Sequence, residues 1–134
     1  MGVEIVLVGG AKLAVSWEMD GLNEGLSINL DSGDSNSEDR QGELVDVSTT
    51  DGWKRVLGRK IEGLAFASHI PNDGCPEALW SIRLDLSGTA SVVIALGEMR
   101  GDHLGYLPDG LVVIFNEVEA RSYRILSSSQ SSWC

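Results

Sequence analysis

The apolar side chains of this chain occur in short runs, many of which alternate with polar residues, and turn-forming dipeptides separate the runs. Leu13, Val15 and Trp17 share one parity, and the apolar residues between Leu26 and Leu30 alternate with polar ones. A period of two residues is typical of antiparallel strands that bury one face. We therefore predict a mainly β fold, an antiparallel sandwich or barrel of eight or nine short strands.

The turn signals between the runs give the approximate ends of these strands. Gly9-Gly10 is predicted to form the turn of a first hairpin, and Gly97 to Gly110 is predicted to be a polar connection. The predicted strands are residues 3–8, 12–18, 26–30, 44–47, 61–70, 79–86, 89–96, 111–115 and 122–126.

One segment has a helical period instead. Trp53, Val56 and Leu57 fall at positions i, i+3 and i+4, Asp51 or the residue before it can cap the start, and Gly58 suits the position after the end. The sequence therefore predicts one short helix near residues 51–57.

Length and composition indicate a single domain. The chain has 134 residues, of which 43% are hydrophobic, and this is enough to bury a core without disulfides or metal. We expect one β-rich domain over residues 1–126 and a disordered Ser-rich tail over 127–134. Cys75 and Cys134 are expected to be free thiols in a reducing cytoplasm. No apolar run approaches the roughly 18 residues that span a bilayer, so we expect no membrane association.

The charge is distributed unevenly along the chain. The net charge is −10, and residues 1–51 carry 11 acidic side chains against 2 basic ones. This balance disfavours nucleic acid, which requires clustered Lys and Arg. It favours an acidic surface that attracts a basic protein. The predicted partner-binding residues are Asp31, Asp34, Glu38, Asp39, Glu43 and Asp46.

The motifs of common catalytic centres do not occur in the sequence. There is no Gly-x-Ser-x-Gly elbow, no His-Glu-x-x-His pair and no CxxC pair, and Gly9-Gly10 lacks the rest of a dinucleotide-binding pattern. We predict no catalytic residue, no metal ligand and no cofactor. The alternative is a small-ligand or enzymatic barrel with a pocket near His69 and His103, the two histidines of the chain.

A predicted short helix ends with WKRVLG at Trp53 to Gly58, the next strand opens with Arg59-Lys60-Ile61, and a hairpin runs through Trp80 to Leu84. In these features, residues 50–117 resemble small bacterial proteins of the toxin-immunity and uncharacterised-domain kind. It implies a protein that acts by occlusion, with a negative face docked on a basic toxin. The uneven charge and the missing catalytic motifs make a non-catalytic binding protein the leading hypothesis. A third hypothesis is a homo-oligomer formed through an edge strand, for which the uncharged run Thr89 to Leu96 is the candidate.

Overall fold

The computed structural model describes residues 2–20, 23–31, 45–70, 74, 77–107 and 110–123. The mainly β prediction is confirmed, since nine antiparallel strands form three sheets in this part of the chain, without a closed barrel. The strands are β1 (Gly2–Val6), β2 (Lys12–Asp20), β3 (Asn23–Asp31), β4 (Ile61–His69), β5 (Ala78–Leu86), β6 (Ala90–Leu96), β7 (Glu98–Arg100), β8 (His103–Gly105) and β9 (Leu111–Ile114). The helices are α1 (Asp51–Val56), the single 3-10 turn η1 (Ser87–Thr89) and α2 (Glu117–Ser122).

The first sheet has the order β1-β2-β3 and confirms the predicted hairpin. Gly9 and Gly10 adopt φ angles of +93° and +92°, a region that glycine enters without steric cost. The Leu7 amide donates to the Ala11 carbonyl at 2.7 Å and closes the connection.

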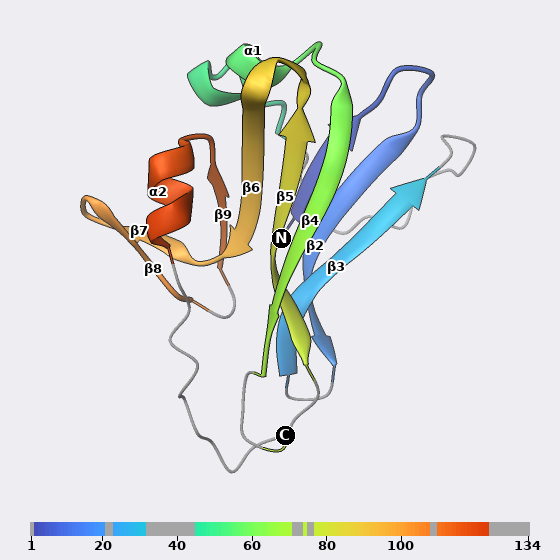
Figure 1. Cartoon of the computed structure of the whole chain (residues 1–134). Coiled ribbons are helices and arrows are strands. Elements are labelled where there is room, and N and C mark those ends of the chain that lie inside the picture. The colour runs from blue at the N-terminus through green and yellow to red at the C-terminus, as the bar shows by residue number, and fades with distance from the viewer. Residues whose placement is uncertain are drawn as a thin grey trace.

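The second sheet has the order β4-β5-β6-β9 and packs against the first as the other layer of a sandwich (Figure 1). Alternation turns one face of each strand inward, so both layers contribute to one core. The buried residues of that core are Leu13, Val15, Leu26, Ile82, Leu84, Leu86, Val92, Ile94 and Leu96.

The outer face of the second sheet has its own cover. Helix α2 lies over β6 and β9 (Figure 1). Its Ala120, and Tyr123 directly after the helix, pack on Ala95 of β6 and Ile114 of β9. This cover lies at the β9 side of the sheet, whereas the opposite edge is the strand β4.

Three sequence predictions are wrong in the described residues. Residues 45–47 form no strand, because the Val47 carbonyl accepts from the Thr50 amide at 3.0 Å and turns the chain toward α1. The polar connection Gly97 to Gly110 contains the hairpin β7-β8, in which Gly101 at φ +64° makes the turn. The sequence predicts a strand over residues 122–126, but Ser122 is the last residue of α2 and Tyr123 is not in a strand. Residues 124–126 lie outside the described part of the chain.

Helix α2 forms because Asn116 caps it. The Asn116 Oδ1 accepts from the amides of Val118 at 2.9 Å and Glu119 at 3.2 Å, which satisfies two of the free donors at the helix start. The predicted helix α1 is confirmed, with Gly58 at φ +82° just beyond its end. In the described residues, neither helix has the length and apolar character needed to cross a membrane.

Candidate functional site

The structure describes two of the six predicted partner-binding acids. Asp31 is the last residue of β3 and is half-buried, and Asp46 is exposed ahead of α1. The Asp46 carboxylate accepts from the Ser48 amide at 2.9 Å, and hydrogen bonds from Ser48 hold its pKa below the usual value. The other four, Asp34, Glu38, Asp39 and Glu43, lie outside the described residues, as do Cys75, Cys134 and the tail 127–134. The acidic N-terminal surface therefore stays a prediction.

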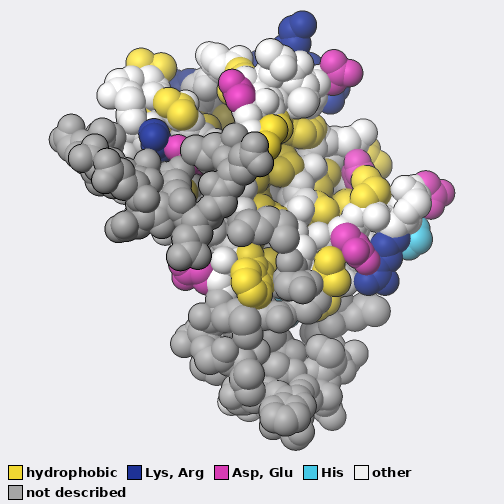
Figure 2. All heavy atoms as spheres, turned by 180° about the vertical axis from the view of Figure 1, so that it is seen from behind, with side chains coloured by type: hydrophobic (Ala, Val, Ile, Leu, Met, Phe, Trp, Pro, Cys, Tyr) yellow, Lys and Arg dark blue, Asp and Glu magenta, His cyan; other side chains and the backbone are white. Residues whose placement is uncertain are grey.

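The face seen in Figure 2 shows how the described charges are spread. Acidic and basic side chains are interspersed there, with hydrophobic side chains exposed between them. On this face, the described residues form no single-sign patch.

The two histidines lie in different strands and take different environments. His69 ends β4, where its half-buried ring packs edge-on against Tyr106 at a centroid distance of 5.8 Å, and burial lowers its pKa. His103 is exposed at the start of β8, and its Nδ1 lies 3.4 Å from Asp102 Oδ1. Across the residues that the structure describes, no three His, Cys, Asp or Glu side chains are grouped as metal ligands.

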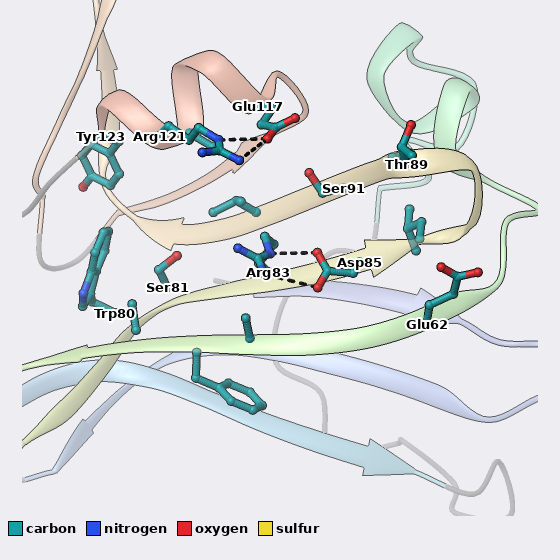
Figure 3. Close-up of a pocket in the computed structure, with 17 residues that line it drawn as sticks. Glu62, Trp80, Ser81, Arg83, Asp85, Thr89, Ser91, Glu117, Arg121 and Tyr123 are labelled. Carbon is teal, nitrogen blue, oxygen red and sulfur yellow. Dashed lines mark hydrogen bonds and ion pairs between the residues drawn. The ribbon is translucent and has the colours of Figure 1, made fainter.

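A groove of about 640 Å³ lies on the outer face of the second sheet, and neither histidine lines it. It runs over β4, β5 and β6 beside α2 (Figure 3). Its floor follows the cross-strand rows Ala67–Ser81, Ala65–Arg83–Val93 and Asp85–Ser91, and Gly63 is the β4 partner of Asp85 in the last row. The β4 residue of each row is glycine or alanine, so the floor there lies close to the backbone of β4.

Two β-bulges set the ends of the groove. Ile61 pairs with Leu86 and Gly63 with Asp85, so Glu62 is an extra residue on β4. Ala67 pairs with Ser81 and Ser68 with Leu79, so Trp80 is an extra residue on β5. A bulge interrupts strict alternation and changes the direction of a side chain. Both extra residues accordingly line the groove.

The aromatic end of the groove is held by Tyr123. Its ring contacts Trp80 edge-on at a centroid distance of 5.4 Å, and its hydroxyl donates to the Leu96 backbone carbonyl. Burial raises the pKa of Tyr123 to about 12, so the hydroxyl keeps its proton at neutral pH. Trp80 is half-buried and packs both on the core between the two sheets and on the cluster of Ala95, Ile114 and Tyr123.

Replacing Tyr123 by phenylalanine is expected to lower the free energy of unfolding by about 1–2 kcal/mol, because the Leu96 carbonyl loses a buried donor. Urea denaturation followed by Trp fluorescence measures this change. Tyr123→Leu also removes the ring contact with Trp80 and should cost more. A Tyr123→Phe variant as stable as the parent protein would show that the hydroxyl contributes nothing.

The charged side chains of the groove form two neighbouring ion pairs. Arg83 Nε lies 2.8 Å from Asp85 Oδ1, and Arg121 Nε lies 2.8 Å from Glu117 Oε1. All four side chains are at least 43% exposed, so these pairs are weak and can exchange partners with a ligand. Glu62 leaves the lining with one more carboxylate than guanidinium groups.

The charged and aromatic groups occupy different ends of the groove. Figure 3 shows Trp80 and Tyr123 together at one end, the Arg83–Asp85 pair in the middle, and Glu62 at the other end. The lining contains no His or Cys side chain. The groove can therefore stack an apolar group at one end and pair a cation at the other.

The search against protein-family models, curated proteins and solved structures finds no match to this chain. The interpretation therefore depends on the residues of the groove. Sequence reasoning missed this site because Glu62 and Trp80 have the wrong parity for the outer face. The one signal that could have indicated it is Gly63 within a strand, since glycine in that position often marks a bulge.

Proposed function

We propose that this protein is a non-catalytic binding protein that holds an extended segment of a basic polypeptide in the groove. The observation that carries the proposal is the polarity of the groove, with Trp80 at the aromatic end and Glu62 at the acidic end, each displaced by a bulge. A polypeptide is the simplest ligand that combines apolar and cationic side chains at fixed spacing.

The spacing of the floor fits an extended chain. The three rows follow every second residue of β4, at Gly63, Ala65 and Ala67. Rows in a sheet are therefore about 6.8 Å apart, which is also the distance between side chains i and i+2 of an extended ligand. Three alternate side chains of one segment can then face the aromatic end, the middle and the acidic end.

The charge of the protein favours a basic partner. The chain has a net charge of −10, and such a field accelerates encounter with cations. The acids predicted from the sequence, Asp31 and Asp46 among those described, would add to this long-range attraction rather than line the groove. An immunity-type role, in which a basic toxin is occluded, is the form of the proposal that the sequence resemblance implies.

Binding without catalysis is the chemistry that the lining supports. Tyr123 is protonated, and Arg83 and Arg121 each hold a neighbouring carboxylate, so these groups are arranged for hydrogen bonding and ion pairing. Nucleophilic catalysis would need a hydroxyl with a base within hydrogen-bond reach. Ser81 and Ser91 line the groove without a neighbouring histidine among the lining residues.

Selection from a displayed library of random peptides tests the proposal. We expect enriched peptides to carry Lys or Arg four residues from a large apolar residue, and their affinity to fall as salt increases. Glu62→Lys should weaken binding of the selected peptides by about tenfold, whereas Glu18→Lys, an exposed change on β2 with the same charge, should have a small effect. Equal losses in both variants would assign the effect to net charge and would contradict the groove.

A further inference from the structure

The strand β4 is an edge of the second sheet in the described residues and carries exposed apolar side chains. Within the described residues, β5 is the strand that pairs with β4. Leu64 is 48% exposed and Phe66 is 55% exposed, although both point to the sandwich side of the sheet. Their cross-strand partners Leu84 and Ile82 are 2% and 1% exposed, so the apolar face of the core continues to the edge without full cover.

Edge strands of this kind are usually protected. Natural proteins place Lys, Pro or an inward-pointing charge on an exposed edge to prevent pairing with another chain. The middle of β4, residues 63–67, has the sequence GLAFA and carries no charge. The charge-free run proposed from sequence, Thr89 to Leu96, corresponds to β6, which is interior because it pairs with β5 and β9. That candidate edge is therefore wrong, and β4 takes its place.

The sequence of β4 is complementary to itself. An antiparallel pair of two β4 strands centred on Ala65 places Leu64 opposite Phe66 of the second copy, twice, on the apolar face. On the other face it places Gly63 opposite Ala67. Aromatic and aliphatic residues directly opposite each other stabilise a strand pair. Centring on Leu64 or Phe66 instead would place one large apolar residue opposite Glu62 or Ser68, and only the Ala65 register pairs both.

One of the two bulges limits the segment of β4 that can pair. The extra residue Glu62 interrupts the backbone of β4 before Gly63, whereas the extra residue of the second bulge, Trp80, belongs to β5, so β4 stays regular from Gly63 to His69. Residues 63–67, which pair with one another in the Ala65 register, contain no ionisable residue, so their direct cross-strand pairs bring no like charges together despite the net charge of −10.

We infer that the protein forms a homodimer by antiparallel pairing of β4 with β4 of a second copy, centred on Ala65. The dimer joins two four-stranded sheets into one continuous sheet. The groove floors would then lie side by side on the same face, because Ala65 and Ala67 line the β4 edge of each. This inference is independent of the ligand that the groove binds.

Disulfide cross-linking of the full chain tests the register. In a Cys75→Ser, Cys134→Ser background, Ala65→Cys should give a covalent dimer, because residues opposite each other have Cα atoms about 4.5–5.5 Å apart. Ala67→Cys is the matched control on the same strand and face. Two copies of residue 67 would lie about 13 Å apart along the strand, so this variant should stay monomeric under oxidation.

Sedimentation equilibrium without peptide measures the association itself. The parent chain should dimerise, and Leu64→Lys should weaken the dimer at least tenfold, since it places a cation opposite Phe66 of the second copy at a position that is exposed in the monomer and does not line the groove. Circular dichroism verifies that the variant folds. A parent chain that stays monomeric at about millimolar concentration, or cross-linking at position 67 and not at 65, would overturn the inference. A monomer that still binds peptides would leave the groove proposal unaffected.

Discussion

Replacing Leu84 by alanine is expected to lower the free energy of unfolding by about 3 kcal/mol, whereas Leu64→Ala is expected to cost less than about 1 kcal/mol. The two leucines are direct cross-strand partners on one face of the second sheet, so the two variants remove the same side chain from neighbouring positions of the same sheet. Leu84 is 2% exposed in the core, and its truncation leaves a cavity between the layers. Leu64 is 48% exposed, so water fills the space that its truncation leaves and no buried cavity forms.

Urea denaturation at low chain concentration measures both free energies under conditions that favour the monomer. A domain of this size is typically stable by 5–15 kcal/mol, so the Leu84→Ala variant should remain folded in water. Equal losses at the two positions would show that the first sheet covers β4 as fully as β5 and would contradict the description of β4 as an uncovered edge.

The strands with strict alternation were predictable from the sequence. In β5 and β6 the residues Leu84, Val92 and Ile94 point into the core as their parity requires, and the glycine pair after β1 makes the predicted turn. Burial of one face fixes such strands in a single register, because a slip by one residue would expose the whole apolar set.

The failures occur where local hydrogen bonding outweighs apolar content. Val47 is apolar, yet its carbonyl accepts from Thr50 and the chain turns instead of pairing. Asn116 caps a helix in a segment where Val118 and Ala120 gave no clear period, and Val118 is 77% exposed. The short hairpin β7-β8 contains too few residues for a period to be read.

The site was harder to predict than the fold because it depends on exceptions to alternation. Strand parity assigns Glu62 and Trp80 to the core side of the sheet, and the bulges alone turn them toward the groove. A bulge depends on how two strands pair, and the sequence of one strand does not contain that information. The position of α2, which leaves β4 and part of β5 open, is likewise a tertiary property.

Filling the groove is expected to abolish binding of selected basic peptides. Ala67→Trp places a large ring on the floor beside Ser81, and the affinity should fall by at least about 100-fold, equivalent to roughly 2.8 kcal/mol. Tryptophan is compatible with a strand, so the variant should fold. Isothermal titration calorimetry measures the affinity. Met99→Trp adds the same side chain at an exposed position outside the groove and should bind within about twofold of the parent.

The most direct measurement is the map of amide chemical-shift changes when the labelled protein is titrated with a selected peptide. Binding in the groove predicts changes concentrated at Glu62–Ala67, Trp80–Leu86, Thr89–Val93 and α2, the segments that line it. Changes concentrated instead on β1 to β3, or around Asp46, with these segments unaffected, would contradict the groove and would place recognition on the N-terminal part of the chain.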